Sequence, residues 1–101
     1  MKASKFPHLS RDDRLSVAVA SRLLRAIYNV PPKKVARAIG YRDTYFNQFE
    51  RSDELTRLPP SDDIIESVAQ YFDLEVGQLI KVGKCKTPIK AFYYLQEIGR
   101  L

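Results

Sequence analysis

Five polar side chains near the middle of the chain have the donors and acceptors needed to read DNA bases. Asn47 and Gln48 carry carboxamides that can bond an adenine edge at two points, and Arg42 can bond guanine or a phosphate. Thr44 can contact a thymine methyl group or a phosphate. Asp43 can accept from a cytosine amine, although capping of a helix is its favoured role. The simpler interpretation is a polar, solvated helix face, but we expect this set to contact DNA.

Basic side chains on either side of this set can contact the phosphate backbone. Lysine and arginine neutralise phosphates and add affinity without sequence information. The chain has a formal net charge of +5, which favours polyanionic partners. Taken singly, each basic residue is equally well explained as part of a solvated surface. The expected phosphate contacts are Lys33, Lys34, Arg37, Arg51 and Arg57.

Residue types that support catalysis or metal binding are scarce. Cys85 is the only cysteine and His8 the only histidine, so a thiolate cluster or a histidine-based metal site lacks ligands. No nucleophile–base pair or glycine-rich phosphate loop can be assembled from the sequence. We therefore expect a protein that is not an enzyme and needs neither a metal nor another cofactor.

Local signals divide the chain into six helices and predict no strand. Ser10 can cap the first helix, Pro31-Pro32 ends it and opens the second, and Gly40 ends the second. Ser61 and Thr87 are expected to cap the fourth and sixth helices. The predicted helices span about 10–29, 33–39, 42 or 43–51, 61–72, 76–82 and 88–99, with residues 83–86 as a basic connector. The expected fold class is all-α.

The expected domain organisation is one DNA-binding domain over residues 10–83. Residues 1–9, which include Lys2 and Lys5, are expected to form a flexible basic arm. Residues 84–101 are expected to form a C-terminal helix that serves dimerisation or core packing. No apolar stretch approaches the roughly 20 residues needed to cross a bilayer, so we expect no membrane contact. Because a single cysteine cannot form an internal disulfide, we expect a cytoplasmic protein.

Residues 32–51 meet the physical requirements of a helix-turn-helix. Ala36 is small enough for two helices to cross closely, and Gly40 readily adopts the positive φ that the turn needs. Aromatic residues at three- and four-residue spacing are expected to form one buried stripe, which leaves the opposite side of the helix free for a major groove. The stripe consists of Tyr45, Phe46 and Phe49.

The chain resembles the lambdoid-phage repressor and Cro family, the Xre-type helix-turn-helix domains, over roughly residues 22–80. The matching residues are Val35-Ala36, Gly40, Phe46, Phe49, Glu50, Pro60-Ser61, Val68-Ala69, Phe72, Leu74 and Leu79-Ile80. The resemblance implies a five-helix lambda-repressor-like domain, here with an extended first helix and an additional C-terminal helix. It also implies a structural ion pair between Arg25 and Glu50. Pro31 and Pro32 stand where the family usually has Ser-Gln, so one side-chain contact to phosphate is lost.

The last predicted helix is too apolar to lie free in water. It either packs on its own domain or is buried against a second copy, and we favour the second copy because the family binds two-fold symmetric operators. The residues expected at this dimer interface are Ile89, Phe92, Tyr93, Leu95 and Ile98.

Together these features predict a transcriptional regulator that binds a palindromic operator in double-stranded DNA as a homodimer. The third helix would lie in the major groove, and a repressor of phage, plasmid or mobile-element type is the expected class. The alternative is an antitoxin or adaptor whose helix-turn-helix domain also binds a protein partner such as a toxin.

Overall fold

Six helices make up the regular structure of residues 4–101, the part of the chain that the computed structural model describes. This part contains no strand, so the all-α prediction is confirmed. The helices are α1 Arg11–Tyr28, α2 Pro32–Ile39, α3 Asp43–Glu50, α4 Asp62–Tyr71, α5 Val76–Cys85 and α6 Pro88–Glu97.

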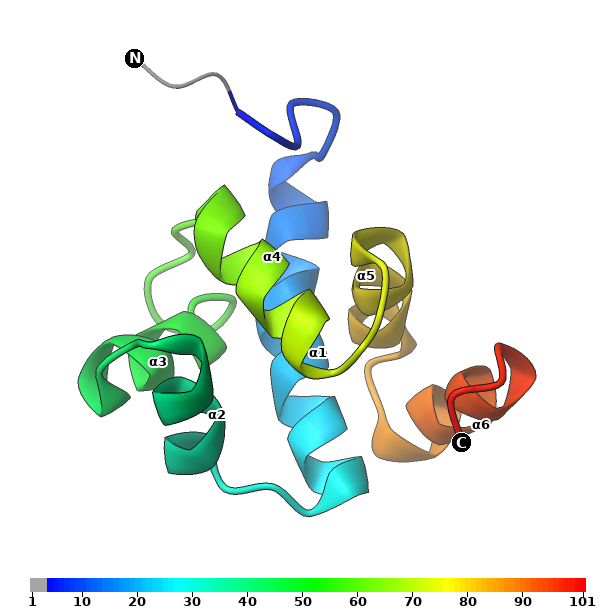
Figure 1. Cartoon of the computed structure of the whole chain (residues 1–101). Coiled ribbons are helices and arrows are strands. Elements are labelled where there is room, and N and C mark those ends of the chain that lie inside the picture. The colour runs from blue at the N-terminus through cyan, green and yellow to red at the C-terminus, as the bar shows by residue number, and fades with distance from the viewer. Residues whose placement is uncertain (1–3) are drawn as a thin grey trace.

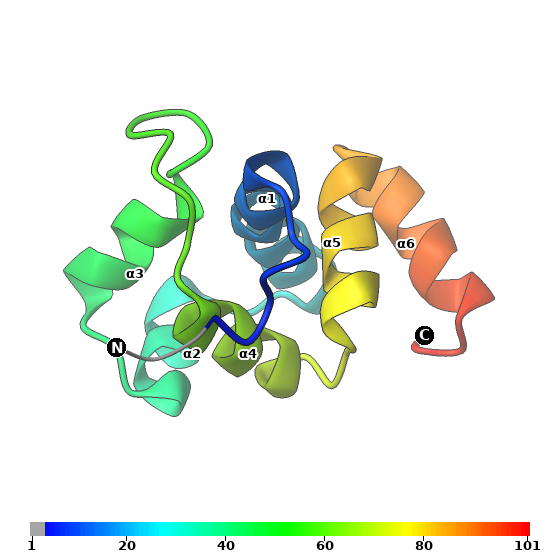
Figure 2. The same ribbon diagram turned by 90° about the horizontal axis from the view of Figure 1, so that it is seen from above.

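The long helix α1 passes through the centre of the molecule. α3 lies on one side of it and α5 and α6 lie on the other, as both views show (Figures 1 and 2). All six helices contribute to one hydrophobic core, which favours a single folding unit. Completely buried side chains include Val17, Leu24, Val35, Phe46, Ile65, Leu79 and Leu95.

The boundaries of α1 follow from residues close to them in sequence. The Ser10 hydroxyl accepts a hydrogen bond from the Asp13 N–H at 3.1 Å, and the Asp13 carboxylate accepts one from the Ser10 N–H at 3.4 Å. This reciprocal capping box satisfies two amides that have no partner within the helix. At the other end Asn29 takes a left-handed conformation with φ 55°, and Pro31 follows, so the helix cannot continue.

Helix α5 is longer than the sequence predicts. Residues 83–86 were expected to form a connector, but the helix continues to Cys85 and ends at Lys86, which has φ 67°. Gly83 lies inside α5 and packs against the backbone of Ser16 in α1. The glycine therefore allows two helices to approach closely and does not end one, and the connector prediction is wrong.

The caps of α4 and α6 differ from each other. Thr87 accepts a hydrogen bond from the Lys90 N–H at 3.4 Å, and Pro88 occupies the first turn of α6, as predicted. Ser61 lies at the N-cap position of α4 but makes no side-chain capping bond. The predicted Ser61 cap is therefore wrong.

Residues 4–9 are held against the helices, so this portion of the predicted flexible arm is fixed. The Ser4 hydroxyl and the Lys5 N–H each donate to Asp62 at 2.8 Å, and the Lys5 ammonium pairs with Glu66 at 2.9 Å. Arg14 of α1 bonds the other Asp62 oxygen at 2.7 Å. Lys2 lies outside the described residues. The Asp62 carboxylate therefore gathers three segments that are far apart in sequence.

These contacts should make stability depend on pH through Asp62. Hydrogen bonds from the Ser4 hydroxyl first, and then from Arg14, hold the pKa of the Asp62 carboxyl at about 2, below its ordinary value of 3.8. Because the folded pKa is the lower one, this stabilisation is present above the ordinary pKa and is lost as pH falls toward 2. We expect this loss to be about 1 kcal/mol. It is measured as the decrease, between the higher and the lower pH, in the difference of unfolding free energy between the wild type and Asp62→Asn.

The control for this prediction is Asp63→Asn, which removes a neighbouring exposed carboxylate but none of these hydrogen bonds. Urea unfolding at about pH 6 and about pH 2.5 provides the comparison. A difference between the wild type and Asp62→Asn that stays constant over this range would contradict the assigned role of Asp62.

Within residues 4–101, no helix combines the length and the apolar character required to cross a membrane.

Candidate nucleic-acid interface

The turn between α2 and α3 consists of residues 40–42. Gly40 has φ 81°, a left-handed conformation that glycine adopts at little cost, and its N–H donates to carbonyl oxygens of α2. The Tyr41 N–H donates to the Ala36 carbonyl oxygen at 2.9 Å, and Ala36 itself is fully buried. Two short helices therefore meet across a tight turn, with a small residue on the inner side of the first.

The inner side of α3 is anchored in the core by aromatic side chains. Phe46 is completely buried and Phe49 nearly so, and their ring centroids lie 5.6 Å apart. Successive side chains of a helix that are three or four residues apart share one side. Burial of Phe46 and Phe49 therefore fixes which side of α3 faces solvent.

An ion pair between α1 and α3 adds a second anchor. Arg25 donates from Nε and Nη2 to the two carboxylate oxygens of Glu50 at 2.7 and 2.8 Å, and the Ser21 hydroxyl donates to Glu50 at 2.6 Å. Glu50 is only 3% exposed. Two parallel bonds from a planar guanidinium restrict orientation as well as distance. The arrangement therefore holds α3 against α1 and determines its rotation about the helix axis.

The outer side of α3 carries most of the residues expected to read bases. Arg42, Thr44, Asn47 and Gln48 are exposed, whereas Asp43 is half-buried in the first turn. A carboxylate at that position interacts favourably with the positive end of the helix dipole. The N-cap is Arg42, which makes no side-chain capping bond, so the expected capping role of Asp43 is wrong.

Tyr45 is the residue of α3 that the sequence analysis misplaced. It was assigned to the buried stripe but is 45% exposed, and its ring stacks on that of Tyr41 with centroids 5.2 Å apart and planes 13° apart. Tyr45 precedes Phe46 by one residue, which rotates it about 100° away from the core. Sequence spacing gave no signal for this pairing, because Tyr41 lies in the turn before α3, where the helical period does not apply.

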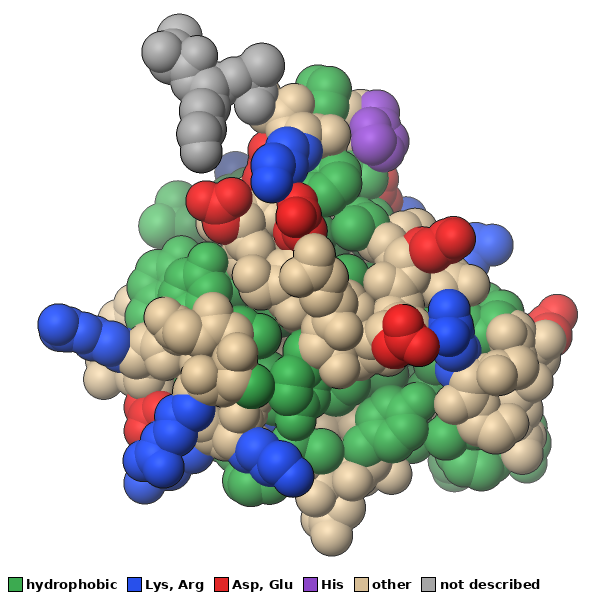
Figure 3. All heavy atoms as spheres, in the orientation of Figure 1, with side chains coloured by type: hydrophobic (Ala, Val, Ile, Leu, Met, Phe, Trp, Pro, Cys, Tyr) green, Lys and Arg blue, Asp and Glu red, His purple; other side chains and the backbone are tan. Residues whose placement is uncertain are grey.

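Helix α2 places three basic side chains beside α3. Lys33, Lys34 and Arg37 are all exposed, and none of them forms an ion pair with another described residue. Lysine and arginine side chains gather on the part of the surface that covers α2 and α3, at the lower left of the space-filling view (Figure 3). This side of the interface is suited to a polyanion.

The basic residues beyond the end of α3 lie in a more balanced environment. Arg51 is exposed and lies 3.9 Å from the Glu54 carboxylate, which also approaches Arg22 at 3.3 Å. Arg57 is exposed and donates from Nη1 to the Asp53 carbonyl oxygen at 3.0 Å. Nearby carboxylates reduce the local positive charge, so this end attracts a phosphate less strongly than α2 does.

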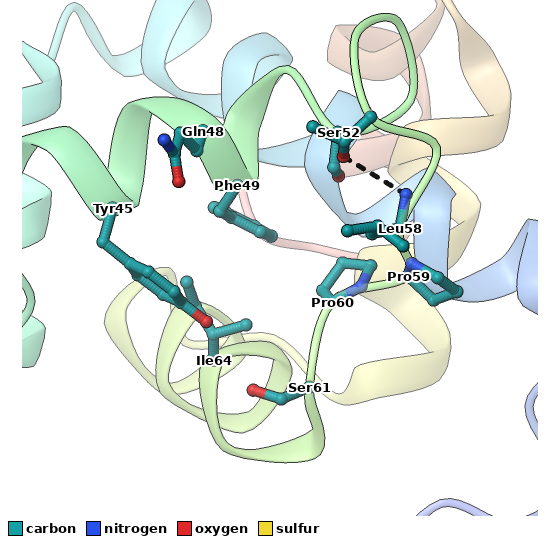
Figure 4. A pocket seen from close by; sticks show the side chains of 10 residues that line it. Tyr45, Gln48, Phe49, Ser52, Leu58, Pro59, Pro60, Ser61 and Ile64 are labelled. Atoms are coloured by element: carbon teal, nitrogen blue, oxygen red, sulfur yellow. Dashed lines mark hydrogen bonds between the residues drawn. The ribbon is translucent and has the colours of Figure 1, made fainter.

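A hollow of about 320 Å³ lies between α3, the loop of residues 52–61 and the first turn of α4 (Figure 4). Tyr45, Gln48 and Phe49 extend toward it from α3, and Pro60 borders it on the loop side. Gln48 thus lies between the exposed polar side of α3 and an apolar rim. Its carboxamide is free to bond a group that approaches from solvent.

The residues expected at a dimer interface differ in their exposure along α6. Ile89, Phe92 and Tyr93 are exposed, Ile98 is half-buried, and Leu95 is completely buried in the core of its own chain. Leu95 packs inward because α6 contacts both α1 and α5. The exposed members form a surface, while Leu95 attaches α6 to the domain.

The described residues contain no group of three or more histidine, cysteine, aspartate or glutamate side chains placed to hold a metal ion. The chemistry available at α2 and α3 is hydrogen bonding and charge attraction. The chain matches no protein-family model, no curated protein and no solved structure.

Proposed function

We propose that this chain binds double-stranded DNA with α3 in the major groove and acts as a sequence-specific transcriptional regulator. The observation that carries the proposal is the two-sided character of α3. Its inner side is fixed by Phe46 and by the Arg25–Glu50 pair, and its outer side exposes Asn47 and Gln48. A rigid helix with exposed carboxamides suits recognition of adenine edges.

We propose further that the domain is of the Xre type, with a lambda-repressor-like arrangement and a repressor role typical of phage, plasmids or mobile elements. Support comes from Gly40 with its positive φ, from buried Ala36 and from the bidentate pair that joins α1 to the end of α3. A single one of these features would be common among helical proteins. Their combination within one turn and two short helices favours the proposal.

Phosphate contacts in this proposal come mainly from α2. Exposed Lys33, Lys34 and Arg37 lie next to α3, where they would neutralise backbone charge and orient the domain. The first residue of α2 is Pro32, so the usual side-chain contact from that position is missing. We therefore expect affinity to depend on lysine and arginine and to fall steeply with salt.

The proposal is tested by selecting bound sequences from a random duplex pool and titrating the selected duplex at several salt concentrations. Enrichment of a motif, together with affinity that falls as salt rises, would support it. Failure to bind any duplex, or binding without sequence preference, would rule out a sequence-specific regulator. A protein partner that occupies α3 would favour the antitoxin or adaptor alternative.

Replacement of Gln48 by alanine should weaken binding to the selected duplex by roughly 1–3 kcal/mol and relax preference at one base step. The carboxamide is exposed on α3 and makes no hydrogen bond to another described residue, so its removal leaves the fold intact. Fluorescence anisotropy with the selected duplex measures the loss.

The matched control for Gln48→Ala is Gln70→Ala, which removes an exposed carboxamide from α4, outside the residues proposed to contact DNA. Single-site duplexes are used so that self-association does not contribute. An unchanged motif and an unchanged affinity for Gln48→Ala would show that this residue does not read bases.

A further inference from the structure

The side of α6 that faces away from the domain forms an apolar stripe. Ile89 is 69% exposed, Phe92 41% and Tyr93 64%, and exposed Gln96 completes the set. These four positions are spaced by three and four residues, so they share one side of the helix. Large apolar side chains gathered at such exposure mark a contact surface. We call these four residues the α6 stripe.

Two charges beside the α6 stripe define the partner that fits it. Lys90 and Glu97 are both exposed and are seven residues apart, almost two helical turns, so they lie on the same flank of the stripe. In a two-fold pair of antiparallel helices, equivalent flanks meet and the residue order is reversed. Lys90 of each copy then lies opposite Glu97 of the other. In parallel two-fold pairing the opposite flanks of the two stripes meet instead, so Lys90 does not lie opposite Glu97.

The α6 stripe and α3 face in opposite directions. α3 contacts α1 through its buried side, and α6 contacts α1 and α5 through the side that carries Ala91 and Leu95. In both views α3 and α6 lie on opposite sides of α1 (Figures 1 and 2). Each helix thus directs its exposed side away from the centre. A second copy seated on α6 is consequently remote from the first copy's α3.

We propose that a second copy of this chain binds the α6 stripe in antiparallel orientation, and that the resulting dimer holds two separate DNA duplexes. This inference rests on the proposed function for its DNA-binding step. Because the two α3 helices of the pair face outward on opposite sides, they cannot enter neighbouring grooves on one face of a single duplex, as a palindromic operator requires. The pair instead bridges two DNA segments, or two distant sites on one molecule.

The antiparallel pairing is tested by exchanging charges at Lys90 and Glu97 and measuring self-association by sedimentation equilibrium. Lys90→Glu alone and Glu97→Lys alone each create like-charge contacts at both ends of the pair, so each should dimerise about tenfold or more weakly than the wild type. An equal mixture of the two variants restores opposite charges and should dimerise like the wild type. Lys81→Glu, the same charge change on an exposed position of α5, is the control.

Bridging is tested with two preparations of the selected duplex, one attached to beads and one fluorescent. The wild type should retain the fluorescent duplex on the beads, and so should the equal mixture of Lys90→Glu and Glu97→Lys. Lys90→Glu alone and Glu97→Lys alone should each bind a duplex but should retain little fluorescent duplex on the beads. Tyr93→Glu, which places a charge within the exposed stripe, should bind a single duplex and fail to bridge.

A wild-type chain that is monomeric, or dimerisation that is unaffected by Lys90→Glu and Tyr93→Glu, overturns the pairing. If two chains bind one duplex but the beads do not retain the second, fluorescent duplex, the bridging proposal is overturned. A charge-dependent dimer that binds no duplex supports the pairing and overturns the proposed function. Sedimentation without DNA therefore separates failure of this inference from failure of DNA binding.

Discussion

A chain in which alanine replaces Glu50 is expected to lose about 3–5 kcal/mol of unfolding free energy. Glu50 is 3% exposed and accepts three hydrogen bonds, two from Arg25 and one from Ser21. Its removal leaves a guanidinium and a hydroxyl without their partner in a largely buried place, where the lost hydrogen bonds are not replaced by water. Small domains commonly have only about 5–15 kcal/mol in total, so the variant is expected to be marginally folded.

Urea unfolding followed by far-ultraviolet circular dichroism measures this loss. Glu54→Ala is the matched control, because Glu54 also pairs with arginines, Arg22 at 3.3 Å and Arg51 at 3.9 Å, but its side chain is 55% exposed. We expect the control to change stability by less than about 1 kcal/mol. If the two glutamates gave equal losses, burial of the Arg25–Glu50 pair would not be the cause.

A second variant of the pair separates charge from packing. Arg25→Met combined with Glu50→Leu removes both charges and keeps apolar volume, and it should recover much of the stability that Glu50→Ala loses. Recovery of stability without recovery of DNA binding would indicate that the ion pair orients α3 as well as holding it. This comparison uses the same unfolding measurement and the duplex titration.

Gly83→Ala is expected to destabilise the domain by about 3 kcal/mol or more, although alanine is the better helix former. A Cβ at this position would lie 1.9 Å from the carbonyl oxygen and 2.7 Å from the carbonyl carbon of Ser16. Both atoms belong to the backbone of α1, so rotation of a side chain cannot relieve the overlap. The two helices would have to move apart along a core interface that is packed without space to spare.

The control is Gly77→Ala in the same helix. A Cβ at Gly77 meets no atom within 4 Å, so this substitution should stabilise the domain by about 0.5–1 kcal/mol through helix propensity and a less flexible unfolded chain. Thermal unfolding of the two variants should therefore shift in opposite directions. Stabilisation by both alanines would mean that α1 and α5 are not in close contact at Gly83.

The boundaries of several helices could be predicted because local chemistry sets them. Ser10 caps α1 with its own hydroxyl, Pro32 begins α2, Gly40 ends it with a positive φ, and Thr87 with Pro88 begins α6. Each signal acts through a backbone dihedral or a hydrogen bond between residues close in sequence. Such interactions need no knowledge of what lies across the core.

Three of the errors occurred where a distant segment determined the outcome. Gly83 was expected to lie in a connector, but it lies inside α5, where the backbone of Ser16 in α1 packs against it. Residues 4–9 were expected to be free, but Asp62 and Glu66 of α4 hold them. Tyr45 was expected to be buried, but the rotation of α3 that Phe46 and Glu50 set leaves it outside. In each case the deciding contact joins residues that sequence spacing does not relate.

The same distinction applies to the candidate site. Composition and spacing were enough to predict a helical chain with a polar third helix and a basic second helix, because side-chain type and helical period are local properties. Only the packing of six helices around α1 decided that Leu95 is buried, that Ile89 and Tyr93 are exposed, and that α6 lies opposite α3. The direction in which a side chain or a helix faces depends on contacts between segments that are far apart in the chain. The order of residues along the chain does not contain those contacts explicitly.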